Sequence, residues 1–307
     1  QVVSNMLAES GQYRRLEKSF QGISFNTIQV DIDKKGITET ANQLALVYQN
    51  LVSLDRKLSS IARRLLAIDP VLSGARQQGL KPNVLPTNFK SQMHYISGQL
   101  MTAMKIDEVA EMAIQEHKAG KKPMIVISRT MEAFLKEYAA DNNLKPGDEI
   151  NISYNDLLLR YLERTKRFKV KIGGELMPDI SLAQSKIINR EPVFTLNNTL
   201  IQQVAEELGL GDVVGEFEEL KFQIKSLDFK QLSVKPIDDL IDKLEDAGIK
   251  VKELTGRGMI ITKDGKLKSR VNSASSVRKG VNEFNAGDVD ALVMNRVAGT
   301  GLSMHSA

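Results

Sequence analysis

The sequence has no cysteine and no tryptophan, and only three histidines among its 307 residues. Without cysteine the chain can form neither a disulfide bond nor a thiolate site for zinc or an iron–sulfur cluster. His94, His117 and His305 are scattered, and no two of them have the spacing of a metal-ligand pair. We therefore predict no metal site that this chain builds by itself.

Long apolar runs are also missing. No stretch approaches the roughly 20 apolar residues that a membrane span needs, and residues 1–20 are too polar for a secretory signal. The chain starts with Gln1 rather than Met, which suggests that it begins inside a longer protein. Together with the lack of cysteine, the lack of a membrane span and of a secretory signal leads us to expect a cytoplasmic protein.

Several sequence motifs of catalysis are absent as well. There is no G-x-x-x-x-G-K-[ST] phosphate loop, no acidic run after a buried strand that would hold magnesium, and no nucleophile elbow. We therefore expect no ATP hydrolysis by this chain alone and name no catalytic residue. The lack of G-x-G-x-x-G after a first strand also argues against a Rossmann-like enzyme.

Charge is nearly balanced overall but uneven along the chain. The net charge is +4, yet residues 160–171 hold six basic side chains and one acid, and residues 204–221 hold six acids and one base. A weak positive excess is compatible with nucleic-acid binding without identifying it. For each charged run, a solvated helix face is an equally good explanation.

The N-terminal part has helical periodicity. Apolar residues recur at threes and fours over 38–68 and again over about 89–118, whereas 69–88 is rich in proline and glycine and predicts a loop. We assign 1–118 to a helical region.

An alternation of buried strands and helices then begins. Strands are predicted at 124–128, 249–256 and 290–295, and helices at 130–142, 236–248 and 275–287. Residues 144–235 interrupt the alternation with polar sequence and helical pieces at 153–169 and 197–222. The predicted fold is α/β: an open parallel sheet formed by 119–143 and 236–307, with an N-terminal helical region and a mainly helical insertion at 144–235.

Polar and glycine residues follow each predicted strand, where a parallel sheet places its working loops. They are Ser128, Arg129 and Thr130 after the first strand, Thr255, Gly256 and Arg257 after the second, and Arg296, Ala298, Gly299, Thr300, Gly301, Leu302 and Ser303 after the third. Gly299 and Gly301 would let backbone N–H groups approach a phosphate, and Thr300 and Ser303 add hydroxyl groups. A tight turn without a ligand explains the last loop equally well.

Four stretches of the chain resemble a known family. Residues 236–257 (PIDDLIDKLEDAGIKVKELTGR) and 281–307 (VNEFNAGDVDALVMNRVAGTGLSMHSA), together with 7–25 and 89–135, are similar to the second RecA-like lobe of superfamily-two helicases. Within that superfamily they resemble the Strawberry notch group, including relatives encoded by phages and plasmids. The resemblance implies a protein of a bacterial host or a phage, and packaging into a virion stays open. The resemblance covers most of the chain and is weakest over 140–235.

The resemblance implies roles for individual residues. Arg129 and Thr130 match helicase motif four, and Thr255, Gly256 and Arg257 match a strand end that faces the nucleic-acid backbone. Thr300 matches the part of motif five that touches nucleic acid, and Gly299, Gly301, Leu302 and Ser303 match the part that lines the nucleotide cleft. The first lobe, with its phosphate loop and magnesium box, has no counterpart here, and neither has motif six.

The expected function is therefore that of an incomplete motor lobe. It would bind DNA, with RNA still open, and would act in an ATP-dependent helicase or translocase. ATP and Mg²⁺ would bind only together with a first lobe, supplied in cis or in trans. The alternative is a degenerate lobe that serves as a non-enzymatic scaffold or a packaged structural component, with 144–235 as its docking surface.

Overall fold

The computed structural model describes residues 24, 26–33, 36–69, 83–86, 89–128, 130–172, 175–176, 184–188, 191–270 and 273–295. The chain divides into two units, residues 1–30 and 31–307. The described residues of the first unit, 24 and 26–30, form neither a helix nor a strand. All the elements discussed below belong to the second unit. Its described residues form a mixed α/β fold with eight helices, a three-stranded parallel sheet and antiparallel strands.

The two long N-terminal helices confirm the periodicity seen in the sequence. Helix α2 spans Thr38–Ile68 and helix α4 spans Phe89–Lys118. The apolar positions of α2 at three- and four-residue spacing, from Leu44 to Leu65, are at most 7% exposed. Burial of this stripe against neighbouring elements stabilises a helix far more than its intrinsic propensity does.

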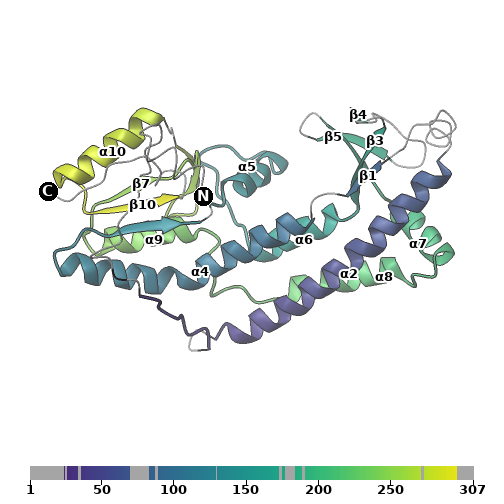
Figure 1. The fold of residues 1–307 in the computed structure, drawn as a ribbon, viewed down its shortest axis with the longest axis horizontal. Coiled ribbons are helices and arrows are strands. Elements are labelled where there is room, and N and C mark those ends of the chain that lie inside the picture. Colours follow the sequence, from purple (N-terminus) through teal and green to yellow (C-terminus); the bar gives the residue numbers. More distant parts are fainter. Residues whose placement is uncertain are drawn as a thin grey trace, which may run out of the picture. The chain divides into compact units, whose positions relative to one another are not determined.

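The predicted parallel sheet is present. Strand β10 (Ala291–Asn295) lies between β2 (Met124–Ile127) and β7 (Val251–Leu254) and pairs with both in parallel. In Figure 1, helix α10 (Ala274–Ala286) lies on one face of this sheet and α9 (Pro236–Asp246) on the other. Each of the three strands and both helices match a predicted element.

Helix α10 ends as the sequence predicts. Gly287 follows it with φ of 86°, the left-handed conformation in which glycine is favoured because it carries no Cβ. Helix α5 (Glu132–Asp141) follows β2 and confirms the helix expected there.

Residues 144–235 contain more strand than the sequence suggests. Helix α6 (Tyr154–Arg164) ends where strand β3 (Arg167–Ile172) begins, so the helix expected over 153–169 is too long. The helix expected over 197–222 is two helices, α7 (Asn198–Glu207) and α8 (Val213–Ser226), separated by Gly209 and Gly211 with positive φ. The expectation of a mainly helical insertion is therefore correct only in part, because the described residues of 144–235 contain strands as well as these three helices.

An antiparallel sheet accounts for the remaining strands of this part. Strand β3 pairs with β1 (Asn83–Pro86) on one side and with β6 (Glu191–Thr195) on the other, and β6 continues the sheet to β5 (Gln184–Ile188). Strand β4 (Glu175–Leu176) also pairs with β3. The expected loop over 69–88 therefore contains a strand, because β1 lies within it.

A short hairpin was not predicted either. Strands β8 (Met259–Ile261) and β9 (Leu267–Ser269) pair in antiparallel directly after the turn that follows β7. Ile261 and Leu267 are buried and belong to the same apolar core as α2, α6 and α8.

Helix α4 takes part in two apolar cores. Its residues Ile96, Leu100 and Ala103 belong to the large core shared with α2, α6, α7 and α8. Its residues Ile106 and Ala110 belong to the core between the parallel sheet and α9. One continuous helix therefore connects the packing of 144–235 to that of the parallel sheet.

Candidate functional site at the carboxyl edge of the parallel sheet

The carboxyl ends of the three parallel strands lie at one edge of the sheet. Ile127 of β2 pairs with Asn295 of β10, and Leu254 of β7 pairs with Met294 of β10. The last residues of the three strands therefore lie side by side (Figure 1). The edge brings together the described site residues that the sequence predicts, namely Thr130, Thr255, Gly256 and Arg257.

After β2 the chain is held by helix α4. The hydroxyl of Tyr95 donates a hydrogen bond of 2.7 Å to the carbonyl oxygen of Thr130, which is half-buried. Ser128 is exposed. Arg129, the other predicted motif-four residue, lies outside the described residues.

After β7 the predicted site residues differ sharply in exposure. Thr255 is 1% exposed and donates its hydroxyl hydrogen to Glu253, whereas Gly256 is exposed. The side chain of Arg257 is 3% exposed. Its Nη2 lies 2.5 Å from Oδ1 of Asp238 and 2.9 Å from Oε2 of Glu253. The guanidinium of Arg257 thus lies between two carboxylates and, in this conformation, does not face solvent.

The pKa values of this cluster follow from burial and pairing. Burial raises the pKa of Asp238 above its ordinary value, although hydrogen bonds and attraction from Arg257 act against the rise. Burial acts in the same direction on Glu253, but the hydrogen bonds and positive charge of Arg257, with further help from Thr255 and Arg270, lower its pKa overall. The two carboxylates outweigh burial at Arg257, whose pKa is raised. Arg257 therefore stays charged although it is buried.

Arg270 and Glu132 extend the cluster toward solvent and toward β2. The guanidinium of Arg270 contacts both the carboxylate and the backbone carbonyl of Glu253, and its side chain is 25% exposed. Oε1 of Glu132, on α5, accepts a hydrogen bond of 2.6 Å from the backbone N–H of Gly258. The helix that follows β2 is thus tied directly to the turn that follows β7.

The sequence reasoning missed Asp238, Glu253, Arg270 and Glu132. A partial signal was present, since Glu253 and Arg257 are four residues apart and opposite in charge. The partner on α9 and the one beyond β9 come close only when the chain folds. No local pattern marks them.

The predicted loop after β10 cannot be placed. Thr300 and the predicted nucleotide-cleft residues Gly299, Gly301, Leu302 and Ser303 lie outside the described residues, as does Arg296. Their roles stay predictions from the sequence.

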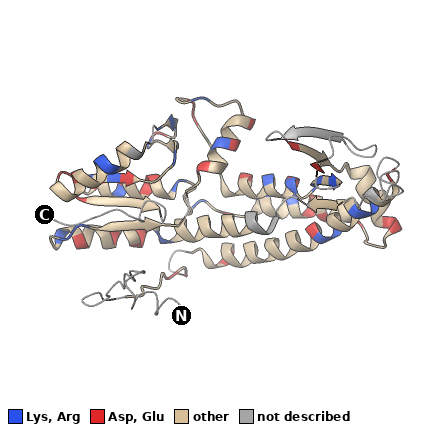
Figure 2. Cartoon of the chain, turned by 45° about the horizontal axis from the view of Figure 1, so that its top comes forward, with Lys and Arg blue, Asp and Glu red and all other residues tan. Residues whose placement is uncertain are grey.

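The basic run at 160–171 is not a free cationic stripe. Arg160 lies 2.7 Å from Asp141, Arg164 pairs with Glu137, and Lys169 pairs with Glu191. Figure 2 shows basic and acidic residues mixed along this part of the chain. These ion pairs compensate much of the run's positive charge.

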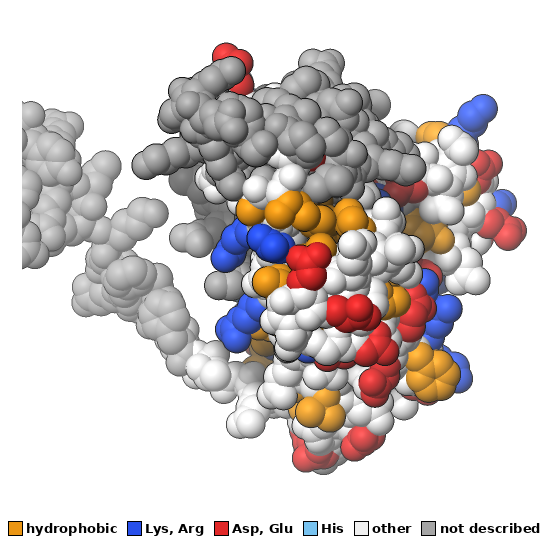
Figure 3. All heavy atoms as spheres, turned by 90° about the vertical axis from the view of Figure 1, so that its right-hand side faces the viewer, with side chains coloured by type: hydrophobic (Ala, Val, Ile, Leu, Met, Phe, Trp, Pro, Cys, Tyr) orange, Lys and Arg blue, Asp and Glu red, His pale blue; other side chains and the backbone are white. Residues whose placement is uncertain are grey.

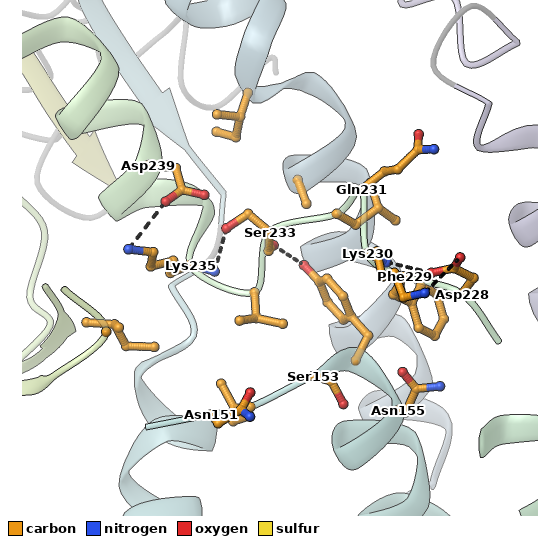
Figure 4. Close-up of a pocket in the computed structure, with 18 of the residues that line it drawn as sticks. Asn151, Ser153, Asn155, Asp228, Phe229, Lys230, Gln231, Ser233, Lys235 and Asp239 are labelled. Atoms are coloured by element: carbon orange, nitrogen blue, oxygen red, sulfur yellow. Dashed lines mark hydrogen bonds and ion pairs between the residues drawn. The ribbon is translucent and has the colours of Figure 1, made fainter. Parts of the chain in front are cut away.

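A pocket of about 660 Å³ lies elsewhere, where residues 227–235 pass between α6 and α9 (Figure 4). Its polar side chains contact the protein itself. The Nζ atom of Lys235 lies 3.6 Å from Oδ1 of Asp239, and Asn155 donates to the carbonyl of Ile224 at 2.6 Å. The hydroxyl of Tyr154 donates to the carbonyl of Ser233 at 2.9 Å. These contacts fit a joint between two parts of the fold better than a ligand site.

Among the described residues, no group of three or more histidine, aspartate or glutamate side chains could hold a metal ion. None of the helices in the described ranges is both long enough and apolar enough to cross a membrane.

Comparison with known proteins adds no family. No family of known proteins, no curated protein and no solved structure matches the chain. The evidence for a function therefore comes from the residues and their arrangement.

Proposed function

We propose that this chain is the nucleic-acid-binding second lobe of an ATP-dependent DNA helicase or translocase of the Strawberry notch type, with a RecA-like sheet. The observation that carries the proposal is the shared carboxyl edge. Three parallel strands, far apart in the sequence, end side by side there. In the sequence, the segments that match motif four, the T-G-R strand end and motif five follow these three strands.

In this proposal the edge faces the nucleic-acid backbone. The exposed turn at Gly256 approaches the phosphates, and the buried Arg257 holds that turn in place through Asp238 and Glu253. Contacts to phosphates position a protein without reading sequence, and they weaken as salt rises. The loop from Gly299 to Ser303 would reach the nucleotide cleft, which a first lobe with ATP and Mg²⁺ completes.

A binding assay with the full chain tests the proposal. We expect weak binding to a labelled single-stranded or double-stranded DNA in fluorescence anisotropy at low salt, with the affinity falling steeply as salt is added. ATP hydrolysis with Mg²⁺ should stay at the level of the buffer. The absence of any DNA binding at low salt would overturn the proposal.

The variant Gly256→Asp tests whether the turn after β7 lies close to the phosphates. A Cβ at Gly256 meets no atom within 4 Å, and its backbone is not in the left-handed region, so the fold should tolerate the substitution. The new carboxylate should weaken DNA binding about tenfold, since like charges repel at close range. Gln203→Asp on the exposed surface of α7 makes the same charge change far along the chain and should leave binding unchanged.

A non-enzymatic scaffold is the second candidate, and one observation favours it. Helices α7 and α8 carry the exposed acids Glu206, Glu207, Glu218 and Glu219. Figure 3, which views the molecule from the right-hand side of Figure 1, shows acidic side chains spread over that face beside basic ones. A chain that binds no DNA but captures a basic partner through these acids would support the scaffold. Loss of capture in a Glu218→Gln, Glu219→Gln variant would locate the surface.

A further inference from the structure

The hairpin β8–β9 carries a row of basic side chains that no sequence motif marks. Lys266, Lys268 and Arg270 occupy alternate positions of an extended segment, so they lie on one face of it. The residue between the first two, Leu267, is 1% exposed and pairs with buried Ile261 on the opposite face. The apolar face of the hairpin is therefore buried in the protein, and the basic face is turned outward.

The row is held rigidly on both sides. The backbone N–H of Arg270 donates to the carbonyl of Gly258 at 2.8 Å, which ties the segment to β8. On its other side, Leu267 bonds to the carbonyl of Asp148 at 2.9 Å and to the N–H of Gly147 at 2.7 Å. The spacing of the row is thus fixed by backbone hydrogen bonds and does not depend on flexible loops.

The acids around the row compensate only part of its charge. The Nζ atom of Lys266 lies 3.2 Å from Oδ2 of Asp264, and Glu149 lies opposite Lys266 across a single bridge. Arg270 contacts Glu253 and keeps a quarter of its side chain exposed. Lys268 is exposed, and no ion pair to it is recorded within the described ranges. Lys268 is therefore the member of the row whose charge no ion pair among the described residues compensates.

We infer that this row binds the phosphate backbone of the nucleic acid, an inference that rests on the proposed function and names the surface that performs it. The row starts at the carboxyl edge, because Arg270 contacts Glu253 of β7 and Gly258 of the turn. Alternate residues of a strand are about 6.8 Å apart, so the row presents its positive charges at regular intervals along a line that starts at this edge. The basic row therefore matches a regular polyanion that runs along the edge.

The neighbouring residues favour nucleic acid over a membrane surface. Proteins that bind membrane surfaces place apolar and aromatic side chains beside their basic ones. Here Ile261 and Leu267 are at most 4% exposed, and the two other large apolar side chains of the hairpin, Met259 and Ile260, are half-buried. None of the exposed large apolar side chains among the described residues lies on the hairpin, so the row has no exposed apolar side chain beside it.

The test compares two doubly substituted forms of the full chain. The first variant carries Lys266→Glu and Lys268→Glu, which reverse the charge of the two exposed lysines of the row. Arg270 is left in place because it pairs with Glu253 of the buried cluster. Lys118→Glu, Lys230→Glu changes the net charge equally, at two exposed lysines on α4 and in the 227–235 segment. The probe is a fluorescein-labelled thymidine oligonucleotide, read by anisotropy from low to moderate salt.

We expect the hairpin variant to bind at least about tenfold more weakly at low salt, with a salt dependence flatter by roughly 1.4 in logarithmic slope for two lost contacts. The control variant should lose much less affinity and keep the slope of the unsubstituted chain. Equal loss in both variants would overturn the assignment of the hairpin while leaving the proposed function intact. No binding by the unsubstituted chain would overturn the proposed function itself.

The nature of the anion is tested with a competitor. Polyglutamate of matched charge should displace the oligonucleotide poorly from the unsubstituted chain. If polyglutamate competes as well as DNA and the hairpin variant loses both, the row is a general acceptor of acidic chains, and its assignment to nucleic acid is wrong.

Discussion

Arg257 shows at the scale of a single residue why a buried ion pair must be complete. Substituting Arg257 with Met leaves Asp238 and Glu253 buried without their main positive partner. Removing one member of a buried ion pair costs about 3–5 kcal/mol of unfolding free energy. We expect a loss of this size in urea unfolding for Arg257→Met and a change within about 0.5 kcal/mol for the exposed control Lys268→Met. A loss below about 1 kcal/mol for Arg257→Met would show that the pairing is not formed in solution.

Glu253 gives the cluster a predictable dependence on pH. Its pKa in the folded chain is lowered below 4.5, so its stabilising contribution is present above that pH and is lost as the pH falls. The contribution of Asp238 depends on pH in the opposite direction. Its pKa is raised in the folded chain, so protonation of Asp238 favours the folded chain as the pH falls. We expect Glu253→Gln to flatten the fall of unfolding free energy between about pH 5 and pH 3, and Asp238→Asn to steepen it. Parallel curves for the three proteins would contradict this assignment.

The sequence correctly predicts that the T-G-R residues follow a strand. It does not predict which of them are buried. A strand end in a parallel sheet is predictable from the alternation of strands and helices. The burial of Arg257 depends on Asp238, 19 residues earlier on α9, and on a hairpin that the sequence did not indicate. The basic row around Lys268 could not be predicted for the same reason. Its exposure to solvent depends on which face of the hairpin is buried.

At the scale of one element, Gly280 sets how closely α10 approaches the sheet. A Cβ at this position would lie 2.7 Å from Cδ2 of Leu254 and 3.0 Å from Cγ of Lys252. Alanine normally gains about 1 kcal/mol over glycine inside a helix, but overpacking costs about 1–3 kcal/mol. We expect Gly280→Ala to lower the urea midpoint and Asn282→Ala, on the exposed side of α10, to leave it unchanged or raise it. A higher midpoint for Gly280→Ala would mean that α10 lies farther from β7.

Long helices could be predicted and short antiparallel strands could not. Helices α2 and α4 repeat the same apolar spacing over many turns, which gives a strong signal. Strand β3 follows α6 after two residues and continues its basic sequence, so nothing local marks the change from helix to strand. Strand β1 is four residues long and is stabilised by its pairing with β3, some 80 residues later. Such pairing is decided by the fold and not by the segment.

At the scale of the whole molecule, α4 couples the two main apolar cores. Leu100 and Ala103 pack in the core with α2 and α6, and Ile106 and Ala110 pack against α9 and the parallel sheet. As long as α4 is continuous, neither core can lose its helix without disturbing the other. We therefore expect residues 31–295 to unfold in a single cooperative transition, with equal calorimetric and van't Hoff enthalpies.

Lys105→Pro tests this coupling, because Lys105 is exposed and lies between the two sets of core residues. Proline in a helix interior removes a backbone hydrogen bond and costs about 3 kcal/mol or more. We expect the variant to unfold in two separate transitions in calorimetry, one for each core, whereas Lys105→Ala should keep one transition. Leu157→Ala and Leu240→Ala, each fully buried in a different core, should then each shift a different transition of the proline variant. A single transition in Lys105→Pro would show that contacts other than α4, such as the hairpin between α9 and the large core, are sufficient to join the two parts.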